Sequence, residues 1–155
     1  IPTDVVCAIG INDVQGTSNA AFEASYQALI RDVWDLGAQR MYVVQIGTGE
    51  NDTSFANATD RTSRYAKNAI IAGLPAWAKA NGYGDGFVNY IALPASLSSD
   101  TEYDSSLFKT SPNVHYDIGG TKLFGETMGQ AVAKKIGASS GSGGGNNAMQ
   151  QSMGV

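Results

Sequence analysis

Three short apolar runs constrain the fold more than any other feature of the chain. They are Asp4–Gly10, Met41–Gly47 and Gly86–Leu93, and each has a glycine at one end. Apolar runs of this length, rich in β-branched and aromatic residues, are typical of strands that are buried on both faces of a sheet. We therefore predict three buried strands.

Helical spacing follows each of the first two predicted strands. Residues 19–36 carry an apolar stripe, with Ser18 as the expected N-cap and Gly37 as the expected end of the helix. A second helix is expected from about residue 61 towards residue 73. Because Pro75 has no amide proton to donate, we expect a kink or a new helical turn there.

The rest of the chain is expected to form a loop, a helix and a tail. We expect an irregular loop over 94–113 and a helix over about 121–136. The apolar stripe of that helix consists of Phe124, Met128, Val132 and Ile136. Residues 138–155 carry no charged side chain, and 139–147 are typical of a flexible Gly/Ser/Asn-rich linker. We therefore divide the chain into an α/β domain, 1–137, and an uncharged tail.

The alternation of strands and helices predicts an α/β fold with a parallel sheet, right-handed crossovers and helices on both faces. Active sites in such sheets lie beyond the carboxyl ends of the strands. The loops that follow the three predicted strands are therefore the expected location of functional residues.

Charge and residue counts exclude several classes of site. The formal net charge is −4, and the 10 basic residues are scattered, which argues against a nucleic-acid surface. One Cys and one His exclude an internal disulfide and any metal site built from several Cys or His residues. No apolar run approaches the roughly 20 residues of a membrane span, and no phosphate-binding or dinucleotide-binding glycine motif follows a strand. We expect no cofactor and no metal.

Composition also bears on where the protein acts. Charged residues make up only 15% of the chain, which contains 19 glycines. A polar but weakly charged surface is common in secreted and virion proteins, so we expect an extracellular, secreted or virion-associated protein. The chain begins Ile1-Pro2, which we interpret as trimming or cleavage of a longer product.

Two stretches in the expected loops share a pattern with a known enzyme family. Gly10-Ile11-Asn12-Asp13 ends the first predicted strand, and His115 precedes the last helix, followed by Gly119-Gly120. In this order and about 100 residues apart, they resemble the third and fifth sequence blocks of the SGNH hydrolases, the GDSL-type esterases. The resemblance covers roughly residues 4–136 and implies a flavodoxin-like, three-layer α/β/α fold.

The resemblance implies a role for each of four residues. Asn12 would donate a hydrogen bond to the oxyanion, and such a prearranged donor is worth about 3 kcal/mol in the transition state. His115, the single histidine, would be the general base. Gly10 and Asp13 are expected to support the substrate-binding loop, Gly10 by permitting a sharp turn at the strand end.

Three parts of the family's site are missing from this chain. It has neither the Gly-Asp-Ser block that carries the nucleophile nor the block whose glycine amide is the second oxyanion donor. Pro112 stands where the family has the acidic partner of the histidine, so Asp117, Asp104 or a backbone carbonyl are the alternatives. The chain thus resembles the C-terminal two-thirds of an SGNH domain. We expect it to expose a sheet edge, and a companion segment or chain to supply the missing strands and serine.

Other features have two interpretations. Residues 49–52 repeat the Gly-x-Asn-Asp pattern after the second strand, but the copy at 10–13 directly abuts a strand. The acidic residues of 100–104 are interpreted as a solvated loop in preference to a calcium site. Cys7 is expected to be a small core residue, and Trp34 and Trp77 are expected to pack on apolar helix faces in preference to forming sugar-binding platforms.

Two functions remain open at this point. The expected function, which the resemblance implies, is that the chain is part of an SGNH-type serine esterase or deacetylase that hydrolyses an acyl ester, with an acetyl ester on a carbohydrate as the expected substrate. Alternatively, it is a non-catalytic, SGNH-like module of a larger assembly, such as a virion fibre or another surface protein. The low charge, Pro112 and the uncharged tail favour the second function, and a homo-oligomer is compatible with either.

Overall fold

The centre of the computed structural model, which describes residues 3–48, 58–108 and 115–141, is a sheet of three parallel strands. The strands lie in the order β1 (Asp4–Cys7), β2 (Arg40–Val44) and β3 (Val88–Ile91). In the middle of the sheet, Tyr42 lies opposite Val6 on one side and Asn89 on the other. All three strands were predicted, and each ends sooner than its apolar run.

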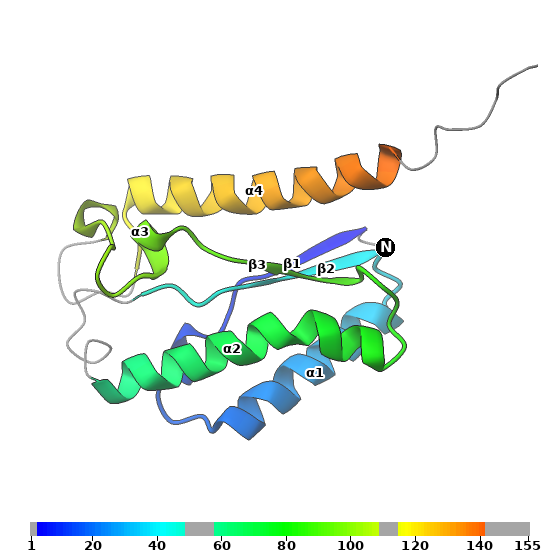
Figure 1. Ribbon diagram of the computed structural model, residues 1–155, viewed down its shortest axis with the longest axis horizontal. Helices are drawn as coiled ribbons and strands as arrows, with labels where there is room; N and C mark the ends of the chain where they lie inside the picture. The colour runs from blue at the N-terminus through cyan, green and yellow to red at the C-terminus, as the bar shows by residue number, and fades with distance from the viewer. Residues whose placement is uncertain (1–2, 49–57, 109–114, 142–155) are drawn as a thin grey trace, which may run out of the picture.

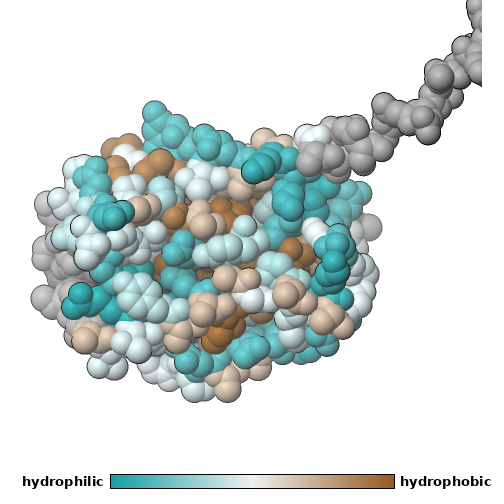
Figure 2. All heavy atoms as spheres, viewed as in Figure 1, coloured by the Kyte–Doolittle hydropathy of each residue, from teal (hydrophilic) through white to brown (hydrophobic). Residues whose placement is uncertain are grey.

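Helices cover both faces of this sheet, as Figure 1 shows. The helices α1 (Asn19–Asp35) and α2 (Ala58–Ala80) lie together on one face, and α4 (Ile118–Gly141) lies on the other. The sequence-based prediction of an α/β fold, with a parallel sheet between two helical layers, is confirmed. Figure 2 shows that the hydrophobic residues on the viewed surface form separate patches between polar ones.

The central strand connects two hydrophobic cores. Met41 and Val43 point into the core shared with α1 and α2, whereas Tyr42 and Val44 point into the core under α4. All four side chains are buried, because β2 has a helical layer on each side. Cys7 packs in the first core, as expected.

The two outer strands differ in how they are covered. Val5 and Cys7 pack into the core with α1 and α2, so Val6 points to the opposite face of the sheet. No β1 residue belongs to the core under α4, and Val6 is 44% exposed, while Ile9 just beyond the strand is 56% exposed. Within the described residues β1 pairs with β2 alone. β1, like β3, therefore has an unpaired edge among the described residues, and its Val6 is not covered by α4.

The first helix follows its sequence signals closely. The Ser18 hydroxyl accepts a hydrogen bond from the amide of Ala21 at 3.2 Å, which satisfies one of the free donors at the helix start. At the other end, Gly37 has a φ of 80°, a left-handed conformation that favours glycine.

The second helix is longer than predicted. Pro75, where a kink or a new helical turn was expected, lies inside α2, and the helix continues past it to Ala80. Leu74 and Ala78 on either side of the proline are buried at 1% and 0% exposure. Burial of this apolar stripe offsets the one hydrogen bond that proline removes.

The region expected to be an irregular loop contains two short helices. They are α3 (Ala95–Ser98) and the 3-10 helix η2 (Ser105–Leu107). Asp104 caps η2 by accepting the Ser106 amide at 3.0 Å.

The last helix extends past its predicted ends in both directions. The Asp117 carboxylate accepts the Gly120 amide at 2.8 Å and so provides an N-terminal cap that the sequence analysis missed. At the other end α4 runs to Gly141, into the expected linker, whose remainder lies outside the described residues. Met128 is buried, but Ile136 of the same predicted stripe is 45% exposed. No described helix is both long and apolar enough to span a membrane.

The two tryptophans pack in one aromatic cluster, in which Trp34 remains 42% exposed. Trp34 contacts Tyr83 and Phe87 edge-on, at ring-centroid distances of 5.7 and 4.8 Å. Trp77 stacks on Tyr83 at 5.7 Å. The cluster lies next to β3, where Phe87 precedes the strand.

Candidate functional site

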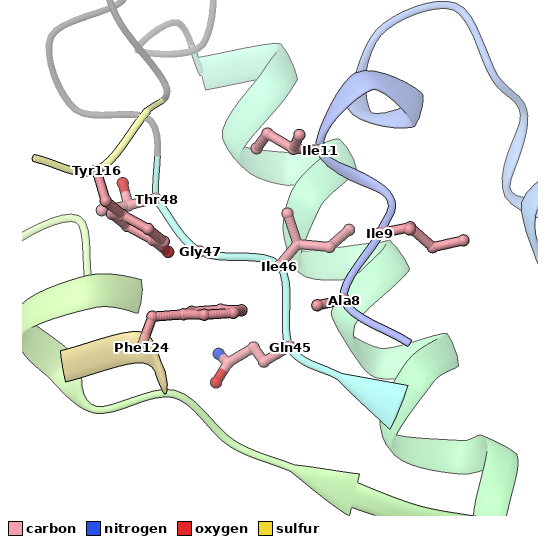
Figure 3. Close-up of a pocket in the computed structure, with 9 residues that line it drawn as sticks. All are labelled: Ala8, Ile9, Ile11, Gln45, Ile46, Gly47, Thr48, Tyr116 and Phe124. Atoms are coloured by element: carbon pink, nitrogen blue, oxygen red, sulfur yellow. The ribbon is translucent and has the colours of Figure 1, made fainter. Parts of the chain in front are cut away.

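A small pocket lies where the carboxyl ends of β1 and β2 meet the start of α4. Its volume is about 130 Å³, and Figure 3 shows its nine lining residues. Ala8, Ile9 and Ile11 form one wall, the segment 45–48 after β2 forms the floor, and Tyr116 and Phe124 form the opposite wall. We call this the strand-end pocket. It occupies the position at which parallel sheets usually bind ligands.

Gly10 turns the chain away from the sheet, beside this pocket. Its φ is 116°, and a Cβ there would lie 3.1 Å from Ile46 and 3.2 Å from Phe22. The chain then enters the 3-10 helix η1 (Ile11–Val14), closed by the Asp13 amide donating to the Gly10 carbonyl at 3.0 Å. The predicted role of Gly10 in a sharp turn agrees with this geometry.

Asn12 and Asp13 lie in that turn and differ in their surroundings. Asn12 is exposed, and Ile11 immediately before it lines the strand-end pocket. The Asp13 carboxylate is half-buried and accepts the hydroxyl of Thr17 at 3.2 Å. Asp13 therefore stabilises the loop that carries Asn12.

His115 directly precedes Tyr116, which is part of the opposite wall of the pocket. His115 itself is exposed. Of its two possible acidic partners, Asp104 is engaged in capping η2 and Asp117 in capping α4. Pro112 and residues 49–52 lie outside the described ranges.

Tyr116 is packed closely between two glycines. A Cβ on Gly47 would lie 2.2 Å from the tyrosine oxygen, and one on Gly120 would lie 2.9 Å from the tyrosine Cβ. An antiparallel bridge to Phe108 fixes its backbone. Burial raises the pKa of the Tyr116 hydroxyl to about 12, with the nearby Arg64 opposing the rise. The hydroxyl is therefore protonated at any physiological pH.

One face of α2 binds all three loops that follow the strands. We call it the anchor face, and it consists of Ser63, Arg64, Lys67 and Asn68. The last three are at least nine-tenths buried. Asn68 accepts the Ile46 amide at 2.8 Å and donates to the Ile46 carbonyl at 3.0 Å, so it fixes the loop after β2.

Lys67 and Ser63 bind the loop after β1. The Lys67 ammonium group donates to the Thr17 carbonyl and to the Ser63 hydroxyl, both at 2.9 Å. The Ser63 hydroxyl in turn donates to the Val14 carbonyl at 2.7 Å. These bonds satisfy a buried cation, which would otherwise be costly, and fix the segment that follows Asn12.

Arg64 binds the loop after β3. It donates to the Ser98 carbonyl at 2.9 Å and forms a buried ion pair with Asp100. Asp100 also accepts the hydroxyl of Tyr65 and, at 3.1 Å, that of Thr48. The hydrogen bond to Asp100 raises the pKa of Tyr65 above its ordinary value.

The acidic loop expected at 100–104 is thus not uniformly solvated. Asp100 is half-buried and engaged with α2, whereas Asp104 is exposed and caps η2. Among the described residues, no group of three His, Cys, Asp or Glu side chains is arranged to bind a metal ion.

Sequence reasoning found the two ends of the site but missed its floor and its support. The structure brings the segments of Asn12 and His115 to opposite walls of one pocket. The missed residues are Gln45 and Tyr116 in the pocket, and the anchor face below it. A signal for the anchor face exists in the sequence, since Lys67 and Arg64 lie on the apolar stripe that continues through Ile71 and Leu74.

The chain was compared with models of known protein families, with curated proteins and with solved structures. None of the three comparisons found a match. What the site can do therefore has to be argued from its own residues.

Proposed function

We propose that this chain forms part of an SGNH-type serine esterase or deacetylase. It hydrolyses a short acyl ester, an acetyl ester on a carbohydrate being the proposed substrate, outside the cell or on a virion. Asn12 is the oxyanion donor and His115 the general base. The nucleophilic serine comes from a companion segment or chain.

One observation carries this proposal. The loops of Asn12 and His115 form opposite walls of a pocket at the carboxyl edge of a parallel sheet, although about 100 residues separate them in the sequence. Acyl transfer needs an oxyanion donor, a general base and a nucleophile, and the two loops carry an amide and an imidazole as candidates for the first two groups. The missing third group is a nucleophile.

The proposed reaction has two steps. His115 takes the proton of the serine hydroxyl as its oxygen attacks the ester carbonyl, and the Asn12 amide donates to the negatively charged oxygen. The carbon–oxygen bond to the alcohol then breaks, and His115 returns the proton to the departing alcohol. In the second step, water attacks the acyl-serine with His115 again as base, which releases the carboxylic acid and regenerates the serine.

The open side of β1 supports a companion. β3 is buried on both faces, but β1 leaves Val6 and Ile9 exposed, and among the described residues no strand pairs with its outer edge. Such an edge is normally covered or paired in a finished protein. A parallel strand added there would end beside Ala8 and Ile9, at the wall of the strand-end pocket, where the nucleophile is needed.

Mass analysis combined with active-site labelling tests the proposal. Intact mass and peptide mapping should find a Gly-Asp-Ser sequence in the purified sample, on a longer polypeptide or a second chain. A fluorophosphonate probe should then label that serine, and His115→Ala should abolish the labelling. A folded sample with no such sequence and no labelling would contradict the proposal.

A second function has its own supporting observation. The exposed apolar face of β1 also suits permanent assembly, as in a non-catalytic module of a virion fibre or another surface protein. In that case a companion would copurify and cover Val6, but the probe would label no serine. The labelling experiment therefore separates the two functions.

A further inference from the structure

The chemistry of the strand-end pocket restricts what it can bind. None of its nine lining residues carries a charge, and most are aliphatic, aromatic or glycine. A phosphate or carboxylate would find no cation among them, and a charged group would lose its hydration without compensation. The pocket therefore selects a neutral group.

The size of the pocket restricts the ligand further. Its volume is about 130 Å³. An apolar cavity of about 150 Å³ engineered in another protein binds one benzene molecule, and typical drug-sized sites begin at roughly 300 Å³. The pocket therefore accommodates a group of a few heavy atoms and not a whole sugar ring with its hydroxyls.

Gln45 supplies a hydrogen-bond donor of fixed orientation. The backbone amide of Leu93 donates to the Gln45 side chain at 2.9 Å. An amide N–H can only donate, so the side-chain oxygen must face Leu93 and the NH₂ group must face away from it. Figure 3 shows this nitrogen on the side of Phe124, within the pocket. No hydrogen bond among the described residues uses the nitrogen, so its protons are available to a ligand.

Tyr116 supplies a second polar atom. Its hydroxyl points past Gly47 into the same space, because that glycine has no Cβ to obstruct it. It stays protonated through the physiological range, since burial raises its pKa to about 12. The Thr48 hydroxyl, by contrast, donates to Asp100 and not to the pocket.

We infer that the strand-end pocket binds a short, neutral acyl group of the acetyl type. The Gln45 amide donates to the carbonyl oxygen, the Tyr116 hydroxyl provides a second donor, and the methyl group packs against Ile46 and Phe124. The assignment of this group as the acyl part of a substrate rests on the proposed function, in which Gln45 and Tyr116 donate to the same carbonyl oxygen as Asn12. The binding itself does not rest on that function, because it needs only this chain's own residues.

An NMR titration of the protein with N-methylacetamide tests the inference without any reaction. This probe keeps the acetyl carbonyl and resists ester hydrolysis. We expect saturable shifts of the Gln45 side-chain NH₂ and of the backbone amides of residues 46–48. N-methylhexanamide, whose acyl chain exceeds the pocket, should bind at least tenfold more weakly.

Two variants separate a specific site from a surface effect. Gln45→Glu keeps the oxygen that accepts from Leu93 but removes the NH₂ donor, and it should weaken acetamide binding at least tenfold. Tyr116→Phe removes only the hydroxyl and should weaken it several-fold. The matched control, Gln130→Glu on exposed α4, makes the same charge change and should have no effect on binding.

Each outcome decides one statement. Unsaturable shifts, equal binding of the two amides, or unchanged binding in Gln45→Glu would overturn the inference even if ester hydrolysis were observed. Specific acetamide binding without any fluorophosphonate labelling would support the pocket assignment and contradict the esterase function.

Discussion

At the scale of single residues, the site contains close contacts that are possible only because Gly10, Gly47 and Gly120 have no side chain. Tyr116 lies against Gly47 and Gly120, and the turn at Gly10 brings the backbone close to Phe22. Asn12 and His115, in contrast, are exposed and contribute little to packing. Substitutions in these two groups of residues should therefore affect different properties.

Substitution of the exposed pair should change activity and not stability. On the proposed function, His115→Ala should abolish ester hydrolysis by the assembled protein, because the chain has no other histidine. Asn12→Ala should lower kcat by about 10²–10³-fold through loss of the oxyanion donor. Steady-state kinetics and thermal unfolding check both statements. Wild-type kcat in both variants would contradict the mechanism.

Gly47→Ala should instead reduce stability and close the strand-end pocket. The added Cβ would lie 2.2 Å from the Tyr116 oxygen and 2.8 Å from the Leu97 carbonyl, so Tyr116 has to move. We expect a loss of about 1–3 kcal/mol in the free energy of unfolding, measured with urea. The control is Gly73→Ala in α2, where a Cβ meets nothing within 4 Å, and it should stabilise by about 0.5–1 kcal/mol. Equal stability of the two variants would show that the contact with Tyr116 relaxes freely.

At the scale of elements, α2 combines a hydrophobic half with a polar half. Ile71, Leu74 and Ala78 pack in the core, and the same stripe continues toward the N-terminus as Lys67 and Arg64. Periodicity alone assigned the helix but not this change along it. The sequence shows the two cations on the apolar stripe, but it does not show which loops they bind.

Loss of a buried cation on the anchor face should be costly. Arg64→Met would leave Asp100 and the Ser98 carbonyl without their charged partner, and we expect a loss of about 3–5 kcal/mol. The matched control is Lys79→Met, which removes an exposed ion pair. The Lys79 side chain is 62% exposed, so this change should cause no measurable loss. Urea unfolding at pH 7 measures both. A small effect of Arg64→Met would mean that water replaces its hydrogen bonds.

The amino ends of β1 and β2 should make stability depend on pH. The hydrogen bond from Arg40 lowers the pKa of Asp4 below its ordinary value of 3.8. The unfolded chain therefore takes up this proton first as the pH falls, so the stabilisation is present above about pH 4 and is lost below it. Asp4→Asn should reduce the fall of the urea midpoint between pH 5 and pH 2.5. An unchanged slope would contradict the assignment.

Local sequence signals predicted the helices and strands well, whereas contacts between residues far apart in the sequence determined the features that were missed. The strands, the Ser18 cap and the α/β order followed from apolar runs, spacing and capping chemistry. The interior position of Pro75 did not, because packing of Leu74 and Ala78 outweighs the preference of proline. Gln45 could not be predicted as a donor, since its orientation depends on Leu93, 48 residues further along the chain.

At the scale of the whole molecule, the two sides of the sheet are unequal. The core under α4 contains residues of β2 and β3 but none of β1, which leaves Val6 exposed. A domain of this size normally buries such a strand on both faces. On the proposed function, the companion segment or chain covers this strand.

A charge on the open face should prevent association. Val6→Lys would place an ammonium group in any contact made there, and it should weaken binding of the companion, or self-association where none is present, at least tenfold. The control is Ile136→Lys on α4, because Ile136 is 45% exposed in the wild type and Val6 is 44% exposed. Analytical ultracentrifugation of both variants measures the effect. Equal association of Val6→Lys and wild type would place the interface elsewhere.

The anchor face has a consequence for how the protein responds to heat. The single helix α2 is bonded to the loops after all three strands, so thermal displacement of α2 carries the floor of the pocket and the loops after β1 and β3 with it. Their mutual distances should then persist during warming, and binding should fail in a single step when α2 detaches. Amide hydrogen exchange would show this as one common opening rate for residues 14–17, 46–48 and 98–100.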